Sequence, residues 1–367
     1  MTKLLNSFFN LEEHNTDVKT EVVAGITTFM TMAYIIFVNP NIVSETGMPF
    51  QAVMIATAMS AAFATLCMAF LANYPFALAP GMGLNAYFTY TVVLGMGLSW
   101  QEALGAVFIS GIIFLILTLT KVRQTIINSM PLTLKSSVSA GIGLFIAFIG
   151  LQNAGVVVNS DATLVTLGNL TDPSAILAIV GIIITGLLMA KDVKGSILIG
   201  IITTTALGIP FGITEMPSAI VEIPSFSTWA PVVFKADISG ALNAGILTIV
   251  FAFLFVDLFD TAGTLIGVSH QAGFLDEDGN LPKADRALLA DSIGTIGGSM
   301  MGTPTVTTYV ESASGVAQGG RTGLTGVVIA LCFLASIFFS PIIAIVPPAA
   351  TAPALIIVGS IMLENVT

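Results

Sequence analysis

The sequence predicts an all-α polytopic membrane protein built as two inverted repeats, and three observations predict it. Of the 367 residues, 55% are hydrophobic and only 9% are charged, whereas soluble domains average about 25% charged residues. Apolar runs long enough to cross a bilayer recur along the whole chain. Two of these runs are interrupted by glycine and proline at matching places, which is typical of secondary transporters. The composition excludes a soluble enzyme.

Seven spans are expected in the first half of the chain. Residues 1–20 are polar and form an N-terminal segment, in which LEEHNTDVKTE is expected to make a short surface helix. The first span should stop at Asn39-Pro40, because proline is disfavoured inside helices. The third span should be a broken helix, because it contains two prolines and two glycines between positions 75 and 83. The seven spans lie at about 22–38, 51–72, 74–95, 102–120, 137–157, 174–190 and 195–209.

A long connection over 210–236 separates this half from the second, in which five further spans are expected. The tenth span is polar for its depth and is broken at Gly302 and Pro304. We expect the five spans at 244–266, 287–301, 301–320, 323–345 and 350–363.

Basic residues set the orientation of the chain. If the N-terminus is cytoplasmic, only Lys235 of the eleven Lys and Arg residues falls in an external connection. Cytoplasmic loops are enriched in Lys and Arg. The distribution therefore favours a cytoplasmic N-terminus and supports the number of spans.

The spacing of the breaks indicates the inverted repeat. The broken spans are the third and the tenth, and this odd offset of seven places the two copies in opposite orientations. Gly25 precedes Pro80 by 55 residues, and Gly245 precedes Pro304 by 59. Interrupted helices at corresponding positions of inverted repeats indicate a transport site.

The eighth span carries two carboxylates in FAFLFVDLFDTAGTL, residues 251–265. Asp257, Asp260, Thr261 and Thr264 follow the i, i+3, i+4, i+7 spacing of one helix face. An Asp at the centre of a membrane helix costs roughly 2.5–3.5 kcal/mol on insertion scales. We therefore expect this face to line a site for substrate and proton, although Asp257 could also be a structural residue.

The two breaks supply further polar groups. A broken helix frees backbone groups that persist at bilayer depth only beside protein or a cavity. Gly83 would permit close backbone approach, and Asn85 offers an amide donor and acceptor. With the carboxylates and no Lys or Arg, such a site favours a neutral heterocycle with N–H donors, or a cation. The expected substrate-binding residues are Asp260, Glu311, Asn85, Gly83, Thr261 and Ser312.

Other residues are expected to have ordinary roles. Asp291 should serve helix packing, and Phe259 should face lipid or the core. Cys67 and Cys332 lie in apolar runs and are expected to be buried hydrophobes. No cofactor and no metal are expected.

Four motifs resemble the AzgA-like hypoxanthine, guanine and adenine permeases, a branch of the nucleobase–cation symporters. The resemblance runs over the whole chain. The motifs are GITTFMTMAYIIFVNP (25–40), PFALAPGMGLNAYF (75–88), FVDLFDTAGTL (255–265) and GTPTVTTYVESASG (302–315).

The resemblance implies a uracil-permease-like fold of fourteen spans in two inverted repeats of seven. It implies a core domain over 21–130 and 237–346, with a gate domain over 131–236 that starts again at 347–367. Since only twelve spans are counted, the last spans are expected to be missing. The resemblance also assigns substrate contacts to Asp260, Glu311 and Asn85. Thr264 stands where uracil-type relatives carry a His.

The expected function is a secondary active transporter that imports a purine nucleobase, namely adenine, guanine or hypoxanthine, by proton symport across the cytoplasmic membrane. Asp260, Glu311 and Asp257 are the expected coupling residues, because a carboxyl group in a low-dielectric site can take up a proton near neutral pH. Sodium is the alternative ion. The expected partner is the lipid bilayer, with no nucleic acid, and the sequence leaves a homodimer open.

Two other classes of protein stay open. The first is an anion transporter of the same fold, which Asp260 and Glu311 disfavour. The second is an intramembrane aspartyl protease that would use Asp260 and Asp291. The expectation is a transporter and not an enzyme.

Overall fold

The computed structural model describes residues 2–120, 122, 132–217, 219–243, 247–277 and 281–364. The expected domain boundary at 130–131 and the first three residues of the eighth span, 244–246, lie outside the described residues. Six described stretches are long and apolar enough to cross a membrane: Val18–Thr46, Phe50–Leu71, Trp100–Leu119, Pro173–Ala190, Leu247–Ala272 and Gly323–Ala344.

The N-terminal segment forms helix α1 (Thr2–Phe9), and the surface helix expected over LEEHNTDVKTE is wrong. Residues 10–15 are turns, in which Asn10 and Asn15 adopt left-handed backbone angles with φ of 55° and 52°. Asn tolerates this region better than most residues. The next helix starts only after Asp17, whose side chain accepts the N–H of Thr20 at 2.7 Å.

The first span consists of α2 (Val18–Met32) and α3 (Ile35–Val43), with the short 3₁₀-helix η1 (Ser44–Thr46) after it. The break lies at Ala33 and Tyr34, so the expectation that Asn39-Pro40 ends the span is wrong. Pro40 lies inside α3, which packs against α4, α5 and α18. Neighbouring helices can satisfy the carbonyl that a proline frees, so membrane helices tolerate it.

The unbroken spans of the first half are confirmed as α4 (Phe50–Leu71), α6 (Trp100–Leu119), α8 (Leu132–Asn153), α9 (Pro173–Ala190) and α10 (Ser196–Gly208). An antiparallel hairpin of β2 (Val157–Ser160) and β3 (Leu164–Leu167), which was not expected, joins α8 to α9. The connection to the second half carries the short helices α11 (Phe226–Trp229) and α12 (Ile238–Asn243).

The second half contains α13 (Leu247–Ala272), α14 (Ala284–Met301), α16 (Gly323–Ser336) and α18 (Pro348–Glu364) at the expected places. The eleventh span continues beyond α16 through the 3₁₀-helix η3 (Ile337–Phe339) and α17 (Ser340–Ala344). Helix α13 extends six residues past the expected end at 266.

Both irregular spans are broken as expected. The third consists of β1 (Leu78–Pro80), α5 (Met82–Ala86) and the π-helix η2 (Tyr87–Gly95). The tenth consists of β4 (Val306–Thr308) and α15 (Ser312–Ala317). The two strands pair antiparallel, with Leu78 opposite Thr308 and Pro80 opposite Val306. The two breaks therefore satisfy each other's backbone.

Symmetric contacts around the strand pair confirm the inverted repeat. On α4, Thr65 Oγ1 donates to the carbonyl of Leu78 at 3.0 Å and accepts the N–H of the same residue at 2.9 Å. On α14, Thr295 Oγ1 makes the same two bonds to Val306, at 2.9 and 3.3 Å. The packing of the helices follows the same symmetry. Helix α16 of the second half packs on α2 and α4 of the first half, and α6 of the first half packs on α13 and α14 of the second half.

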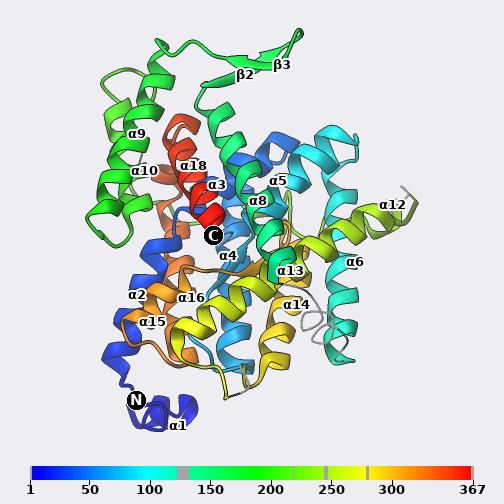
Figure 1. Ribbon diagram of the computed structural model, residues 1–367, viewed down its shortest axis with the longest axis vertical. Coiled ribbons are helices and arrows are strands. Elements are labelled where there is room, and N and C mark those ends of the chain that lie inside the picture. Colours follow the sequence, from blue (N-terminus) through cyan, green and yellow to red (C-terminus); the bar gives the residue numbers. More distant parts are fainter. Residues whose placement is uncertain are drawn as a thin grey trace.

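Helices α8, α9, α10 and α18 form a second group. Helix α18 packs against the other three, and Figure 1 shows α9 and α10 beside it. The contact of α18 with α8 depends on two glycines: a Cβ on Gly143 would lie 2.6 Å from the carbonyl oxygen of Gly359. These helices lie within the ranges expected for the gate domain, and the division into a core and a gate stays a prediction.

Candidate functional site

A cavity of about 430 Å³ lies where the two broken spans meet. Gly81, Met82 and Gly83 line it from the third span, and residues 307–311 line it from the tenth. Small-molecule sites typically occupy about 300–1,000 Å³. The cavity is therefore large enough for a small planar ligand.

The polar wall of the cavity contains two carboxylates. Asp260 comes from α13 and Glu311 from the residue directly before α15. Both are partly buried. Among the described residues, no Lys, Arg or His lines the cavity. The opposite wall is apolar and comes from α8 and α18: Val138, Ile142, Ile146, Val358, Ile361 and Met362.

The polar stripe of α13 serves two different neighbours. Asp260 and Thr264 line the cavity, whereas Asp257 and Thr261 are fully buried behind it. Thr261 Oγ1 lies 3.2 Å from Asp291 Oδ1 and 3.3 Å from Asp257 Oδ1. The four polar residues that were predicted to line one site therefore face two different places. A stripe about 100° wide on a helix can contact both the cavity and α14.

Thr307 of β4 completes the buried cluster, with its hydroxyl 3.0 Å from that of Thr261. Asp291 therefore joins α14 to α13 through Thr261, as the expected packing role requires. Thr261 does not line the cavity, so its expected contact with a ligand is not supported by its position.

Glu311 is held by a neighbouring tyrosine. Tyr34 Oη donates to Glu311 Oε1 at 2.6 Å across the interface between the first and tenth spans. Tyr34 also lines the cavity, as does Tyr309, whose hydroxyl donates to the carbonyl of Pro80 at 2.5 Å. Phe259, expected to face lipid or the core, lines the cavity as well.

Two expected contact residues lie one layer behind the cavity. The amide of Asn85 is fully buried and donates to Asn39 Oδ1. Asn39 Nδ2 in turn donates to the hydroxyls of Thr57 at 2.7 Å and Thr303 at 3.1 Å. Two helical residues after Gly83, a side chain points to nearly the opposite side of α5. A substrate contact by Asn85 therefore stays a prediction.

Ser312 is buried and accepts the N–H of Ala77 at 3.0 Å, so it connects the two broken spans. It follows Glu311 by one residue, a rotation of about 100°, and its side chain does not line the cavity. The structure thus brings Asp260, Glu311 and Gly83 to one cavity. Tyr34 and Phe259 were missed, because an aromatic residue in an apolar span carries no sign of which way it faces.

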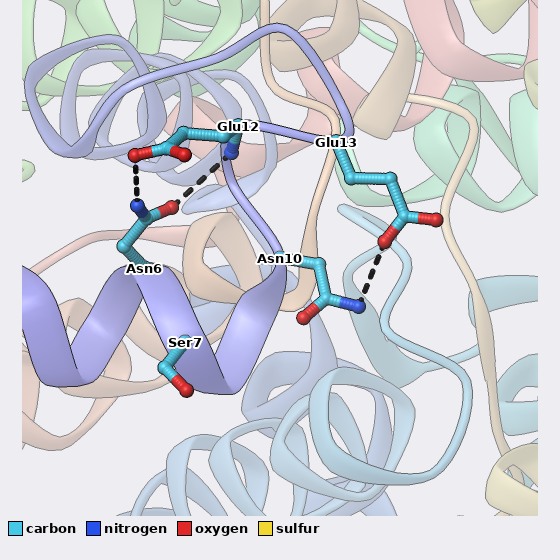
Figure 2. A pocket seen from close by; sticks show the side chains of 5 residues that line it. All are labelled: Asn6, Ser7, Asn10, Glu12 and Glu13. Atoms are coloured by element: carbon cyan, nitrogen blue, oxygen red, sulfur yellow. Dashed lines mark hydrogen bonds between the residues drawn. The ribbon is translucent and has the colours of Figure 1, made fainter.

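A second pocket, of about 360 Å³, lies on the surface at the N-terminus. Figure 2 shows it between the end of α1 and the following turns, lined by Asn6, Ser7, Asn10, Glu12 and Glu13. Its polar groups already bond each other: Asn6 Nδ2 donates to Glu12 at 2.5 Å, and Asn10 Nδ2 donates to Glu13 at 3.0 Å. These bonds stabilise the turn, and the pocket is not a candidate transport site.

Comparison with known proteins shows the family to which the chain belongs. The family model described as "Permease family" (Xan_ur_permease) matches residues 19–367. The chain belongs to this permease family. Together with the adenine and guanine/hypoxanthine permeases among the relatives, this match confirms the resemblance drawn from the four motifs.

The permease has curated relatives over almost its whole length. It is 58% identical to a putative permease of Methanocaldococcus jannaschii over 364 residues. These residues make up 99% of this chain and 83% of the relative. It is 46% identical to the adenine permease AdeP of Escherichia coli, over 99% of this chain and 81% of that protein. It is 44% identical to the guanine/hypoxanthine permease PbuO of Bacillus subtilis, over 98% and 84%.

A solved structure shares the fold of the permease. The transmembrane domain of a cyanobacterium bicarbonate transporter, BicA, superimposes with a TM-score of 0.71 over 94% of this chain and 89% of that one. The sequence identity is 16%, so the likeness concerns the fold alone. The family and the six described apolar helices identify the permease as a multi-pass membrane protein, and the likeness shows its fold.

Proposed function

We propose that this permease is a secondary active transporter that imports purine nucleobases, with adenine, guanine or hypoxanthine as substrate. The observation that carries the proposal is the cavity between the broken spans, where Asp260 and Glu311 supply hydrogen-bond acceptors and the described lining contains no Lys, Arg or His. Purines carry several N–H donors on a planar edge, which such acceptors match.

The rest of the lining supports a planar ligand. Phe259, Tyr34 and Tyr309 contribute aromatic rings, which favour stacked or edge-on contact with a heterocycle. The relatives named as adenine and guanine/hypoxanthine permeases support the same substrate class. Choice among the three purines depends on the shape of the bound complex.

Proton symport is the proposed source of energy. Asp260 and Glu311 line the cavity, and Asp257 lies in the buried cluster with Asp291. Neutralising a buried carboxylate lowers the cost of moving it through a low-dielectric region. A carboxyl group that takes up a proton as substrate binds therefore links the two movements, and sodium is the alternative ion.

The proposed movement is of the gate relative to the core. The core comprises 21–130 and 237–346, and the gate comprises 131–236 with 347–367. Helices α8 and α18 contribute one cavity wall, and α13 with the broken spans contributes the other. A shift between these walls would open the site to either side of the cytoplasmic membrane, with the N-terminus in the cytoplasm.

The two alternative functions are not favoured. An anion would meet Asp260 and Glu311 without a compensating cation among the described lining residues. For a protease, Asp260 and Asp291 would have to face a common substrate, and Asp291 does not line the cavity.

Uptake into proteoliposomes tests the proposal. We expect an imposed inward proton gradient to drive accumulation of labelled adenine, guanine or hypoxanthine, and unlabelled purine to compete. Labelled sulfate and bicarbonate serve as the anion controls and should not accumulate. Anion accumulation without purine uptake would assign the cavity to the alternative class.

A further inference from the structure

Glu311 is tied to the first span at two points. Its side chain accepts the hydroxyl of Tyr34 at 2.6 Å. Its carbonyl accepts the hydroxyl of Ser314 at 2.7 Å, and Ser314 Oγ lies 2.9 Å from Thr31 Oγ1 on α2. Both the backbone and the carboxylate of Glu311 are therefore placed by the first span.

The helices at this contact leave little space for rearrangement. A Cβ on Gly315 of α15 would lie 2.1 Å from Thr28 Oγ1 and 2.7 Å from the carbonyl oxygen of Ala24, both on α2. Tyr34 is fully buried and lies at the break between α2 and α3. The break turns the tyrosine toward the tenth span at the level of the cavity, so its ring and hydroxyl have a fixed position.

The bond to Tyr34 occupies one oxygen of the carboxylate. A phenol–carboxylate bond is charge-assisted and short, so it selects one orientation of the Glu311 side chain. The other oxygen, Oε2, is then left for a ligand in the cavity that Glu311 lines. Orienting a binding group in advance raises affinity, because less freedom is lost when the ligand binds.

We propose that Tyr34 is a positioning residue of the substrate site, and that the first span fixes Glu311 through Tyr34 and through Ser314. The proposal rests on the purine transport proposed above. Tyr34 orients the Glu311 carboxylate and does not itself carry the transported proton. Among the described residues that line the cavity, the other titratable groups are Asp260 from α13 and Tyr309 beside β4.

The structure offers a matched control. Tyr90 Oη donates to Glu45 Oε1 at 2.8 Å, which is the same type of bond, and neither residue lines the cavity. Tyr34→Phe and Tyr90→Phe therefore remove the same hydroxyl from the same kind of partner, once at the site and once away from it.

Purine binding to the purified 367-residue chain is measured by calorimetry over a range of pH, together with the melting temperature. We expect Tyr34→Phe to weaken binding about tenfold, as the loss of one oriented bond does, and to move the pH midpoint of binding. Tyr90→Phe should keep the wild-type affinity and midpoint. In a Glu311→Gln background, Tyr34→Phe should no longer move the midpoint, because glutamine does not titrate.

The proposal would be overturned if Tyr34→Phe bound purine with the wild-type affinity and pH midpoint. It would also be overturned if Tyr34→Phe moved the midpoint by the same amount with Glu311→Gln as without it. If Tyr34→Phe does not fold, Ser314→Ala carries the test, because it removes the second tie and keeps the tyrosine. Unchanged affinity in Ser314→Ala then overturns the proposal, and at least fivefold weaker binding supports it. A wild-type chain that binds no purine contradicts the proposed function itself and is a separate result.

Discussion

At the scale of single residues, the direction in which each side chain of α13 faces decides its role. Asp257 and Asp260 are three residues apart, yet one contacts Thr261 in the buried cluster and the other lines the cavity. The two carboxylates can therefore serve different steps, since only Asp260 is in a position to meet a ligand directly.

Asp260→Asn is expected to separate substrate exchange from accumulation. Asparagine mimics a permanently protonated carboxyl group and keeps an acceptor oxygen, so labelled purine should still exchange across proteoliposome membranes. Accumulation driven only by an imposed pH gradient should be lost, because the residue can no longer release a proton. Undiminished gradient-driven accumulation in Asp260→Asn would move the coupling role to Glu311 or Asp257.

At the scale of elements, the broken spans were predictable and their pairing was not. Gly302 and Pro304, like Pro80 and Gly81, identify the breaks in the sequence itself. The pairing of β1 with β4 depends on three-dimensional proximity across more than 200 residues. Thr65 and Thr295 bond to the strands because of the helix face on which each lies. The sequences of α4 and α14 do not indicate which face of the helix meets a strand.

The same limit explains what the sequence left undetermined within the site. Asp260, Glu311 and Gly83 were correctly expected near one another, because charges and a break mark them. Asn85 and Ser312 do not line the cavity and bond to Asn39 and to the N–H of Ala77, respectively, so their contact with a ligand stays a prediction. Tyr34 was not recognised, since its role depends on a bond to a residue in the other half.

The two threonine contacts provide a test of the symmetry. Thr65→Val and Thr295→Val keep the shape of the side chain and remove the bonds to Leu78 and Val306, respectively. Buried backbone groups left without a partner cost about 1–3 kcal/mol each, so both variants should melt well below wild type and by similar amounts. Thr120→Val is the control, because Thr120 is exposed at the end of its own helix. If either variant melts like this control, its strand does not depend on the threonine.

At the scale of the whole molecule, the cavity lies between two groups of helices. One wall comes from α13 and the broken spans, and the other from α8 and α18. The two walls approach each other closely at Gly83, since a Cβ there would lie 2.3 Å from Ile142 Cγ2 on α8. A branched side chain in a helix has little rotamer freedom, so Ile142 cannot easily move aside.

Gly83→Ala is therefore expected to hold the two walls apart and lower the uptake rate at least tenfold at normal expression. Ile142→Ala in the same chain should restore much of the rate, because it removes the obstructing methyl group. Gly186→Ala is the control, since a Cβ at Gly186 meets no atom within 4 Å. Uptake that is equally slow with and without Ile142→Ala would show that the contact with α8 does not limit transport.

The most direct test of the account is calorimetric titration of purines into purified wild-type protein and three variants. Glu311→Ala should weaken binding roughly a hundredfold or abolish it, because a charged acceptor is removed from the cavity. Glu311→Gln should bind weakly, since its carbonyl oxygen still accepts a hydrogen bond. Glu45→Ala, which removes a carboxylate away from the cavity, should bind like wild type. Wild-type affinity in folded Glu311→Ala would contradict the claim that this cavity binds the purine.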